Sequence, residues 1–399
     1  MKRTIPFVLI AIFIVMGLAA CGGQALECTD PIGCVEVGPD DPILLASSLV
    51  ISGPNTDLGL DSQHGVEIAI DFRGELLGHA IELQPEDDGC NAEGGQTSAT
   101  KIVSNPQIIA MVGTSCSGAG VPAAKIISDN GFAMVSPSNT SPALTAPDQH
   151  EPGYLRTAHN DTVQGRAMAE YAINELGVTK AAAIHDGDPY TEGLASVFSE
   201  AFQELGGEIV AFEAIDANAD DVIAPLTTVA AAGPPEFLYY PVFIPLGSLI
   251  TKQAQEVEGL SGVILAGADG IQSPSFLEAA GDAAQGMYVS GPDLGFGNET
   301  YDRFLTAYQD KYGTEPTAPF HAHAYDATNM ILDAIEKVAQ QGDDGTLLIG
   351  RQALRDALFA TSGMVGITGT ITCDEYGDCA DPKIAVSQVQ GDEFVRIWP

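Results

Sequence analysis

The sequence predicts an α/β protein built from two doubly wound, Rossmann-like lobes. Short apolar runs alternate with amphipathic segments along most of the 399-residue chain. Each strand–helix repeat spans roughly 25–30 residues, as parallel βαβ units do. Two blocks of such repeats are followed by a helix-rich block and a tail of strands, and this length is enough for two domains. Two lobes joined by several crossovers explain this order better than one very wide sheet.

The first block, residues 43–158, supplies the clearest strand. Ile108–Val112 is entirely apolar, as expected for a strand buried on both faces. The other expected strands are Ile43–Ile51, Ala80–Gln84, Phe132–Val135 and Tyr154–Ala158. The helices between them each carry an apolar side, namely Val66, Ala69 and Ile70, then Ala99, Ile102 and Val103, then Val121, Ala124 and Ile127.

The second block starts at Asp161 and contains the most regular helical period, in Glu192–Leu205. Its expected strands are Ala181–His185, Ile209–Ala214, Phe237–Tyr240 and Val263–Gly267. The third block has a strand at Met287–Ser290 and helices near 299–312, 323–340 and 350–360. The tail is expected to form antiparallel strands at Ile367–Thr372, Lys383–Val389 and Phe394–Trp398. We therefore expect one lobe to contain residues 43–158 and 287–366, and the other to contain residues 159–286 and 367–399.

The N-terminus indicates export. Met1-Lys-Arg precedes the apolar run Phe7–Met16 and the small residues Leu18-Ala-Ala-Cys21, which together are typical of a secretory signal. The cysteine at this position resembles the lipobox of bacterial lipoproteins, which implies a signal peptide at 1–20 and acylation of Cys21. An ordinary signal peptide with an incidental cysteine is the alternative. Residues 21–42 are expected to form a tether without regular structure.

The composition excludes some partners. The chain has 16 Lys and Arg residues against 54 Asp and Glu residues, for a formal net charge of −38. Such a surface repels nucleic acid and anionic lipid head groups. The acidity is explained by solubility or by adaptation to a salty medium, where self-repulsion is screened, and an acidic docking surface is the alternative.

Two loops rich in hydroxyl groups follow neighbouring strands of the first block. Ile108–Val112 leads into a loop that contains Ser117, and Phe132–Val135 leads into one that contains Ser138 and Thr140. Consecutive parallel strands bring such loops to the same sheet edge, where ligands of open α/β sheets bind. The chemistry available there is hydrogen bonding, without a metal cage or a strong nucleophile.

Seven cysteines in an exported chain indicate disulfide bonds. With Cys21 acylated, the remaining six fall into neighbouring pairs, although other connectivities are possible. The expected pairs are Cys28–Cys34, Cys90–Cys116 and Cys373–Cys379. Cys90 and Cys116 each follow a strand of the first block, and adjacent strands would bring them together. A catalytic Cys116 is the alternative, but no His lies close to it in sequence.

Residues 43–392 resemble the leucine/isoleucine/valine-binding family of type I periplasmic binding proteins. The resemblance lies in the order and spacing of several short motifs. These are Ser52-Gly-Pro, Glu86-Asp-Asp-Gly-Cys90, Val112-Gly-Thr-Ser-Cys116-Ser117, Ser136-Pro-Ser-Asn-Thr140, His185-Asp with Tyr190-Thr-Glu-Gly-Leu-Ala, Ala280-Gly-Asp-Ala-Ala-Gln-Gly-Met and Ala324-Tyr-Asp-Ala. The resemblance implies a three-strand hinge between the lobes, and Cys90–Cys116 matches a disulfide of that family.

The resemblance also implies a set of ligand-binding residues. The hydroxyl groups of Ser117 and Thr140 are expected to hold the carboxylate of an amino acid. The α-ammonium group would be held by the backbone carbonyl of Ser138, by the Thr140 hydroxyl and by Asp269, which lies in Gly267-Ala-Asp269-Gly270. These roles suit a zwitterion, which needs donors at one end and acceptors at the other.

Around the ligand's side chain, the sequence departs from the family pattern. Leu58 stands where the family has an aromatic residue, and Phe243 lies where a Tyr is usual. Asp269 replaces the longer Glu of many branched-chain amino acid binders, whereas Tyr190 is retained. An amino-acid-like ligand is still expected, but these differences do not single out leucine, isoleucine or valine.

The expected function is that of an extracytoplasmic lipoprotein that binds a small solute for an ABC importer. Its partners would be the amino-acid-like ligand, the ABC transporter permease and the membrane that holds the lipid anchor, and we expect a monomer without a cofactor, a metal ion or enzymatic activity. His321 and His323 could ligate a metal, but a position at a helix start explains them more simply. The alternatives are a sensory receptor of the same fold and, more remotely, an enzyme acting on a small amide.

Overall fold

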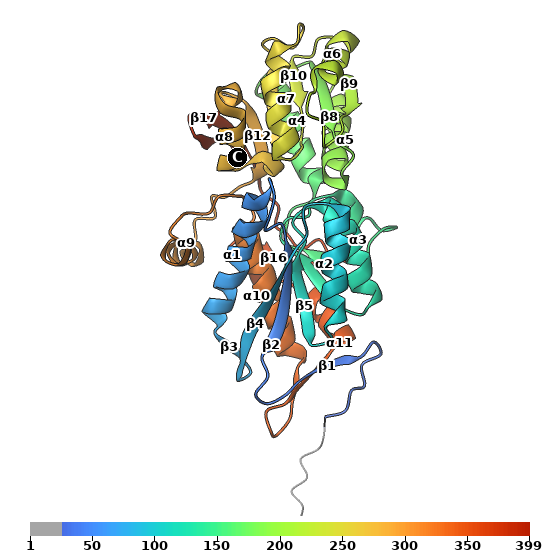
Figure 1. Ribbon diagram of the computed structural model, residues 1–399, viewed down its shortest axis with the longest axis vertical. Coiled ribbons are helices and arrows are strands. Elements are labelled where there is room, and N and C mark those ends of the chain that lie inside the picture. The colour runs from blue at the N-terminus through green and yellow to red at the C-terminus, as the bar shows by residue number, and fades with distance from the viewer. Residues whose placement is uncertain (1–25) are drawn as a thin grey trace, which may run out of the picture.

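The computed structural model describes residues 26–399, which form two α/β lobes stacked along the long axis of the molecule (Figure 1). The predicted fold class, with two doubly wound lobes, is confirmed. The signal peptide and Cys21 lie outside the described residues. Within residues 26–399, no helix is both long and apolar enough to cross a membrane.

The first lobe is built on a six-stranded sheet whose strands are parallel except at the β3 edge. In spatial order its strands are β3 (Glu75–Leu76), β4 (His79–Asp87), β2 (Ile43–Leu49), β5 (Ile108–Gly113), β6 (Ala133–Ser136) and β7 (Tyr154–Arg156). One face packs against α1 (Thr56–Arg73), α10 (His321–Val338) and α11 (Arg351–Phe359). The other packs against α2 (Ala92–Ser104) and α3 (Ser117–Asp129), which lie side by side.

The second lobe contains a seven-stranded mixed sheet. In spatial order its strands are β18 (Glu393–Trp398), β17 (Ile384–Gln390), β12 (Tyr288–Pro292), β11 (Ile264–Ala268), β10 (Phe237–Tyr239), β8 (Lys180–His185) and β9 (Glu208–Ala214). Helices α4 (Asp161–Asn174) and α5 (Pro189–Glu204) cover one face. The other face is covered by α6 (Ile223–Ala232), α7 (Ile244–Gln253) and α8 (Pro274–Ala280).

Short elements complete the first lobe. They are β1 (Cys34–Val37), β13 (Gln340–Gln341), β14 (Leu347–Gly350), β15 (Met364–Val365), β16 (Thr370–Ile371), α9 (Glu299–Tyr312) and the 3-10 turn η1 (Pro142–Thr145). The second lobe has three further 3-10 turns, η2 (Ala254–Glu256), η3 (Asp269–Ile271) and η4 (Gly281–Ala284). The chain crosses between the lobes three times, after β7, after β12 and before β17.

The predicted tether at 21–42 contains a strand. In β1, Val35 and Val37 are each 2% exposed, and Cys34–Val37 pairs antiparallel with β14. The predicted disulfide Cys28–Cys34 is present directly before this strand. Alternate burial of two valines therefore fixes the segment to the end of the first lobe that lies away from the second lobe (Figure 1).

The lobe boundaries near the second and third crossovers differ from the predicted ones. Strand β12 was expected in the first lobe, but it pairs with β11 and β17 and belongs to the second sheet. Conversely, Ile371 and Cys379 are buried in the core of the first lobe. The predicted strand Ile367–Thr372 does not join the C-terminal hairpin; only β16 forms, and it pairs with β15. An apolar run predicts a strand but not the sheet that the strand joins, since both sheets contain buried apolar strands.

Candidate functional site

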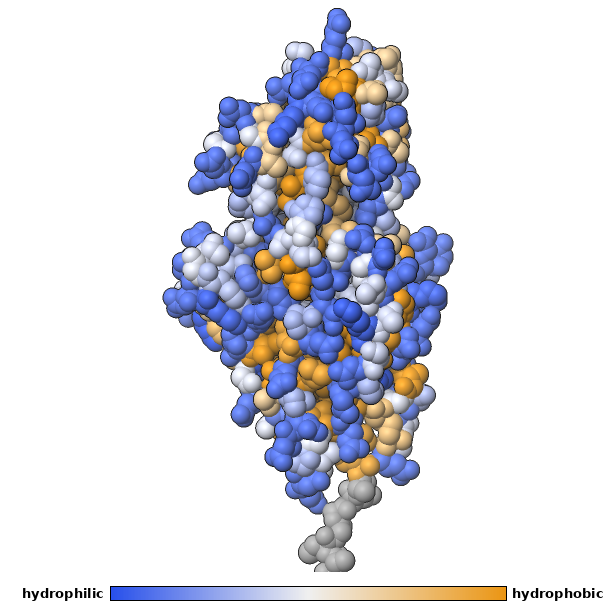
Figure 2. All heavy atoms as spheres, viewed as in Figure 1, coloured by the Kyte–Doolittle hydropathy of each residue, from blue (hydrophilic) through white to orange (hydrophobic). Residues whose placement is uncertain are grey.

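A small cavity lies between the two lobes, near the level at which the molecular surface narrows to a waist (Figure 2). Six of the seven residues predicted to bind the ligand line it; they are Leu58, Ser117, Ser138, Tyr190, Phe243 and Asp269. The remaining lining residues are Ser115, Cys116, Gly270 and Phe320. Thr140, the seventh, is buried in the loop that contains Ser138 but is not among the lining residues.

The first-lobe wall is formed by the loops that end β5 and β6. Ser117 begins α3, and its Oγ accepts the Ser141 N–H at 3.2 Å, so the two loops are tied together. The Ser138 hydroxyl donates to the Ser115 carbonyl oxygen at 2.6 Å. The predicted Cys90–Cys116 disulfide is present and anchors the start of α3 to the loop after β4.

Asp88 accepts hydrogen bonds from the backbone of the same first-lobe wall. Its side chain is fully buried and accepts the N–H of Ser115 at 2.6 Å and that of Cys90 at 2.8 Å. Burial raises the pKa of the Asp88 carboxyl to about 7, and the two N–H groups oppose that rise. The carboxyl and the adjacent disulfide hold the backbone on which Ser115 and Ser117 stand.

Arg156 positions the loop that carries Thr140. Its fully buried guanidinium, at the end of β7, donates to the carbonyl oxygens of Asn139 at 3.1 Å and Ser141 at 2.8 Å. It also pairs with Asp378, which lies inside the small loop closed by the predicted Cys373–Cys379 disulfide. The Thr140 Oγ1 is buried and makes no hydrogen bond of good geometry within residues 26–399, but it lies near the Asp161 carboxyl, whose pKa it lowers.

The second-lobe wall is centred on Asp269, which follows β11. Its Oδ1 accepts a hydrogen bond from Gln164 Nε2 at 2.6 Å and one from the Tyr190 hydroxyl at 3.2 Å. The Tyr190 oxygen in turn accepts the Gly270 N–H at 3.1 Å. Burial raises the pKa of the Asp269 carboxyl to about 6, and the hydrogen bond from Gln164 opposes this. The wall therefore holds a buried acid near its point of ionisation.

Asp161 is a second buried acid, close to Asp269, and in the sequence it marks only the start of the second block of repeats. It is fully buried at the first position of α4, and neither carboxylate oxygen has a hydrogen-bond partner in the described part of the chain. Burial raises its pKa well above the usual range, and the nearby charge of Asp269 raises it further. An acid at a helix start is common for capping reasons alone, so the sequence carried no signal that set it apart.

The remaining lining is apolar. Leu58 packs with Val50 and Ala318, and Phe243 lies against this group. The rings of Phe243 and Tyr190 are 5.3 Å apart. Leu58, Phe243 and Phe320 together give the cavity an end without a charged side chain.

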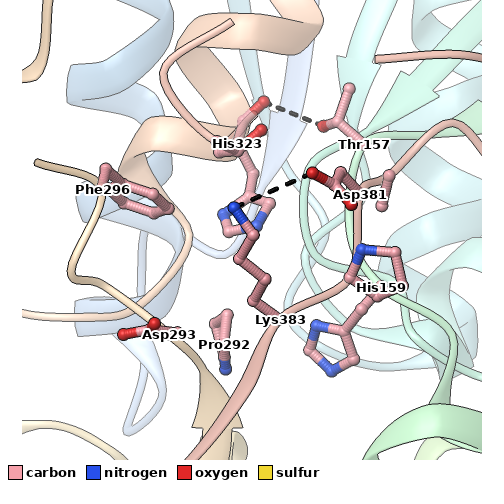
Figure 3. Close-up of a pocket in the computed structure, with 11 residues that line it drawn as sticks. Thr157, His159, Pro292, Asp293, Phe296, His323, Asp381 and Lys383 are labelled. Carbon is pink, nitrogen blue, oxygen red and sulfur yellow. Dashed lines mark hydrogen bonds and ion pairs between the residues drawn. The ribbon is translucent and has the colours of Figure 1, made fainter. Parts of the chain in front are cut away.

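A second small cavity lies at the three crossovers (Figure 3). His159 and His323 line it, and the Nδ1 atom of each is buried without a hydrogen-bond partner in the described chain. Burial lowers the pKa of His159 to about 4 and that of His323 to about 3, so both rings are neutral at pH 7. Both rings also pack on Phe320, which lines the interlobe cavity.

His321 has a structural role. Its Nδ1 lies 2.8 Å from Asp61 Oδ2 and its Nε2 lies 2.9 Å from the Tyr301 hydroxyl. Among residues 26–399, no group of three His, Cys, Asp or Glu side chains could hold a metal ion.

Comparison with known proteins finds relatives over most of the chain. The family model described as "Periplasmic binding protein" matches residues 42–393. The "Leu/Ile/Val-binding protein homolog 3" of Brucella melitensis is 27% identical over 339 residues, which cover 84% of this chain and 88% of that protein. The leucine-, isoleucine-, valine-, threonine- and alanine-binding protein of Pseudomonas aeruginosa is 28% identical over 344 residues, which cover 85% and 87%.

Solved structures share the whole fold. A leucine-binding protein from Thermotoga maritima superimposes with a TM-score of 0.80 at 26% identity, covering 89% of this chain and 97% of that one. A branched-chain amino acid transporter substrate-binding protein from Streptococcus pneumoniae, in complex with isoleucine, has a TM-score of 0.76 at 23% identity and covers 90% and 100%. An ABC transporter solute-binding protein from R. palustris, in complex with benzoate, has a TM-score of 0.73 at 20% identity and covers 90% and 96%. With the family model matching most of its length, the chain belongs to the periplasmic binding protein family.

Proposed function

We propose that this protein binds an α-amino acid with an uncharged, apolar side chain in the interlobe cavity and delivers it to the permease of an ABC importer. One observation carries the proposal: first-lobe hydroxyl groups and the buried second-lobe acid Asp269 line the same cavity. That arrangement suits a small zwitterion, because each end of the ligand meets groups of complementary charge or polarity. The curated relatives are named as amino acid-binding proteins.

At the carboxylate end, the proposed donors are the hydroxyl groups of Ser117 and Thr140. The unpartnered state of Thr140 Oγ1 supports this role, since a buried hydroxyl without a partner is costly. The Ser138 hydroxyl is engaged by Ser115, so Ser138 would contribute its backbone carbonyl to the ammonium group.

At the ammonium end, Asp269 would be the main partner and Asp161 a second one. The two carboxylates lie close enough for their negative charges to repel each other. An ammonium group between them would relieve that repulsion. Hydrogen bonds to charged groups contribute about 1.5–3 kcal/mol each. Three or four of them, less the cost of association, reach the roughly −8 kcal/mol of a micromolar complex.

The side-chain end favours an apolar ligand. Leu58, Phe243 and Phe320 offer no partner for a charged group, and burying an unpaired charge there would be strongly unfavourable. Leucine, isoleucine, valine and methionine therefore fit better than aspartate, glutamate, lysine or arginine.

A thermal-shift screen of the mature protein tests the proposal. A ligand that binds only the folded state raises its melting temperature. We expect uncharged, apolar amino acids to raise it and charged amino acids to leave it unchanged, with benzoate as a ligand that lacks the ammonium group. A rise with benzoate and none with any amino acid would contradict the proposal.

Membership of the family implies an extracytoplasmic location. We propose that a lipid on Cys21 holds the protein at a membrane. We also propose that the protein is a monomer and that it binds its ligand without transforming it. The Leu18-Ala-Ala-Cys21 sequence supports the anchor. Expressed in a bacterial host, the wild type is expected in the membrane fraction and Cys21→Ala in the soluble extracytoplasmic fraction. Equal membrane recovery of both proteins would rule out this anchor.

A further inference from the structure

The carboxylate of Asp188, a residue of the second lobe, contacts helix α3 of the first lobe. It is the N-cap of α5, where its Oδ1 accepts the Tyr190 N–H at 2.8 Å. Its Oδ2 lies against Gly118, the second residue of α3: a Cβ atom built on Gly118 would stand 1.9 Å from Oδ2 and 3.0 Å from Cγ. A single carboxylate thus spans the N-termini of two helices that belong to different lobes, and helix N-termini favour negative charge.

This contact lies directly beside the interlobe cavity. Ser117 precedes Gly118, Tyr190 lies two residues beyond Asp188, and both line the cavity. In the same region the Ser141 hydroxyl of the first lobe donates to the Pro189 carbonyl oxygen of the second at 2.9 Å. Burial raises the pKa of the Asp188 carboxyl to about 6, while the N–H groups of Tyr190 and Gly118 oppose this rise.

A matching contact joins the lobes elsewhere. The Ser275 N–H, at the start of α8 in the second lobe, donates to Asp57 Oδ2 in the first turn of α1 at 3.4 Å. Each lobe therefore presents one carboxylate to a helix N-terminus of the other. Hinge motion between the lobes would break both contacts, because in each the carboxylate and the helix belong to different lobes.

We propose that Asp188 is a closure residue, whose carboxylate docks on α3 when the lobes close over a ligand, and that glycine at 118 is required for this docking. The inference rests on the proposed function, in that closure follows ligand binding. A side chain at 118 would meet the Asp188 carboxylate in the closed form and would be free of it once the lobes part. Asp188 and Gly118 thereby set ligand affinity through closure, because stabilising the closed form stabilises the bound state.

A double-mutant cycle tests this, with L-leucine as the probe in isothermal titration calorimetry. Gly118→Ala is expected to weaken binding at least about tenfold, because Asp188 must leave α3 or the lobes must stay apart. Asp188→Ser retains a residue that can cap α5 but removes the obstructing carboxylate. In the Asp188→Ser background, we expect Gly118→Ala to change the dissociation constant by less than about twofold.

Stability measurements separate closure from damage to the fold. Alanine is a better helix former than glycine, so the ligand-free Gly118→Ala protein should melt no lower than the wild type. An equal loss of affinity in both backgrounds would mean that residue 118 acts without Asp188, and no loss in either would mean that the contact is irrelevant. Each result would overturn the proposal.

A wild-type protein that fails to bind L-leucine would contradict the ligand assignment for leucine but not the closure role of Asp188. The same calorimetric cycle would then be run with L-isoleucine, L-valine and L-methionine as probes. For any of them that binds the wild type, Gly118→Ala is expected to weaken binding at least about tenfold, and by less than about twofold in the Asp188→Ser background. Equal affinities of the wild type and Gly118→Ala for such a probe would reject the closure role.

Discussion

Asp161 and Asp269 place two buried carboxylates close together in the second-lobe wall. Asp269 is partly satisfied by Gln164 and Tyr190, whereas neither oxygen of Asp161 has a partner among the described residues. Such a group destabilises the ligand-free protein, since an unpaired buried charge is costly or must be protonated. In the proposed function, an ammonium group bound beside Asp161 would convert that cost into affinity.

We therefore expect Asp161→Asn to weaken amino acid binding at least about fivefold while the ligand-free protein becomes no less stable. Calorimetry and thermal unfolding measure the two effects. Asp326→Asn is the matched control: Asp326 is equally buried, but it accepts the Ile367 and Thr368 N–H groups at 2.8 and 2.9 Å. This control should lose stability and keep its affinity. A loss of stability with unchanged affinity in Asp161→Asn would exclude Asp161 from the site.

Most of the residues that line the interlobe cavity were predictable from the sequence through their motifs. Ser117, Ser138, Tyr190 and Asp269 stand in short segments whose order resembles a known family, and the structure brings all four to one cavity. Asp161 was not predictable, because an acid at the start of a helix has an ordinary explanation. Its unusual feature is the lack of a partner, which only the folded arrangement reveals.

Among the elements, the segments at the three crossovers bring two buried histidines and several charged side chains to one cavity. His159 lies between β7 and α4, and His323 lies in the first turn of α10. Asp293, Asp381 and Lys383 line the same cavity, and Figure 3 shows Lys383 reaching toward Asp381 beside the His323 ring. Burial is the largest cause of the lowered pKa of both histidines; the rings of His159 and His321 lower the pKa of His323 further, and the charge of Arg156 lowers that of His159.

The lowered histidine pKa values predict a pH-dependent stability. As the pH falls below about 6.5, histidines of the unfolded chain take up protons, whereas His159 and His323 of the folded chain resist them until about 4 and 3. Folding stability therefore falls with decreasing pH over this range, at up to roughly 1.4 kcal/mol per histidine for each pH unit. The raised pKa of Asp269 and Asp326, each about 6, acts in the opposite direction.

The variant His323→Asn isolates the histidine contribution from that of the acids. Urea denaturation from pH 7 to pH 4 should show the wild type losing stability relative to the variant as the pH falls. If the free energies of unfolding of the wild type and of His323→Asn differ by the same amount at every pH in this range, His323 does not resist protonation.

The positions of most helices and strands were predictable from the sequence, whereas the pairing of the strands was less so. The helix predicted near 299–312 has the bounds of α9 (Glu299–Tyr312), because its apolar period and its flanking residues Asn298 and Gly313 agree. By contrast, β12 was predicted as a strand but assigned to the wrong lobe, and β1 was overlooked in a segment rich in Gly, Pro and Asp. Strand partners depend on distant parts of the chain, which local patterns do not specify.

At the scale of the whole molecule, the two lobes meet around a small polar and apolar cavity. The visible surface is largely hydrophilic (Figure 2), in keeping with a formal net charge of −38. The interlobe contacts at Asp188 and Asp57 are short-range and few, which suits lobes that part and close. The strand–helix alternation was sufficient to predict two doubly wound lobes, since each repeat has the length of a βαβ unit.

The central claim is that the cavity holds both charged ends of a zwitterion, the carboxylate through first-lobe hydroxyl groups and the ammonium group chiefly through second-lobe acids. Calorimetry with L-leucine, 4-methylpentanoate and 3-methylbutylamine tests it, because the last two lack the ammonium group and the carboxylate respectively. We predict that L-leucine binds at least about a hundredfold more tightly than either truncated compound, since each truncation leaves buried polar groups unpaired. Equal affinity for L-leucine and 4-methylpentanoate would contradict the claim.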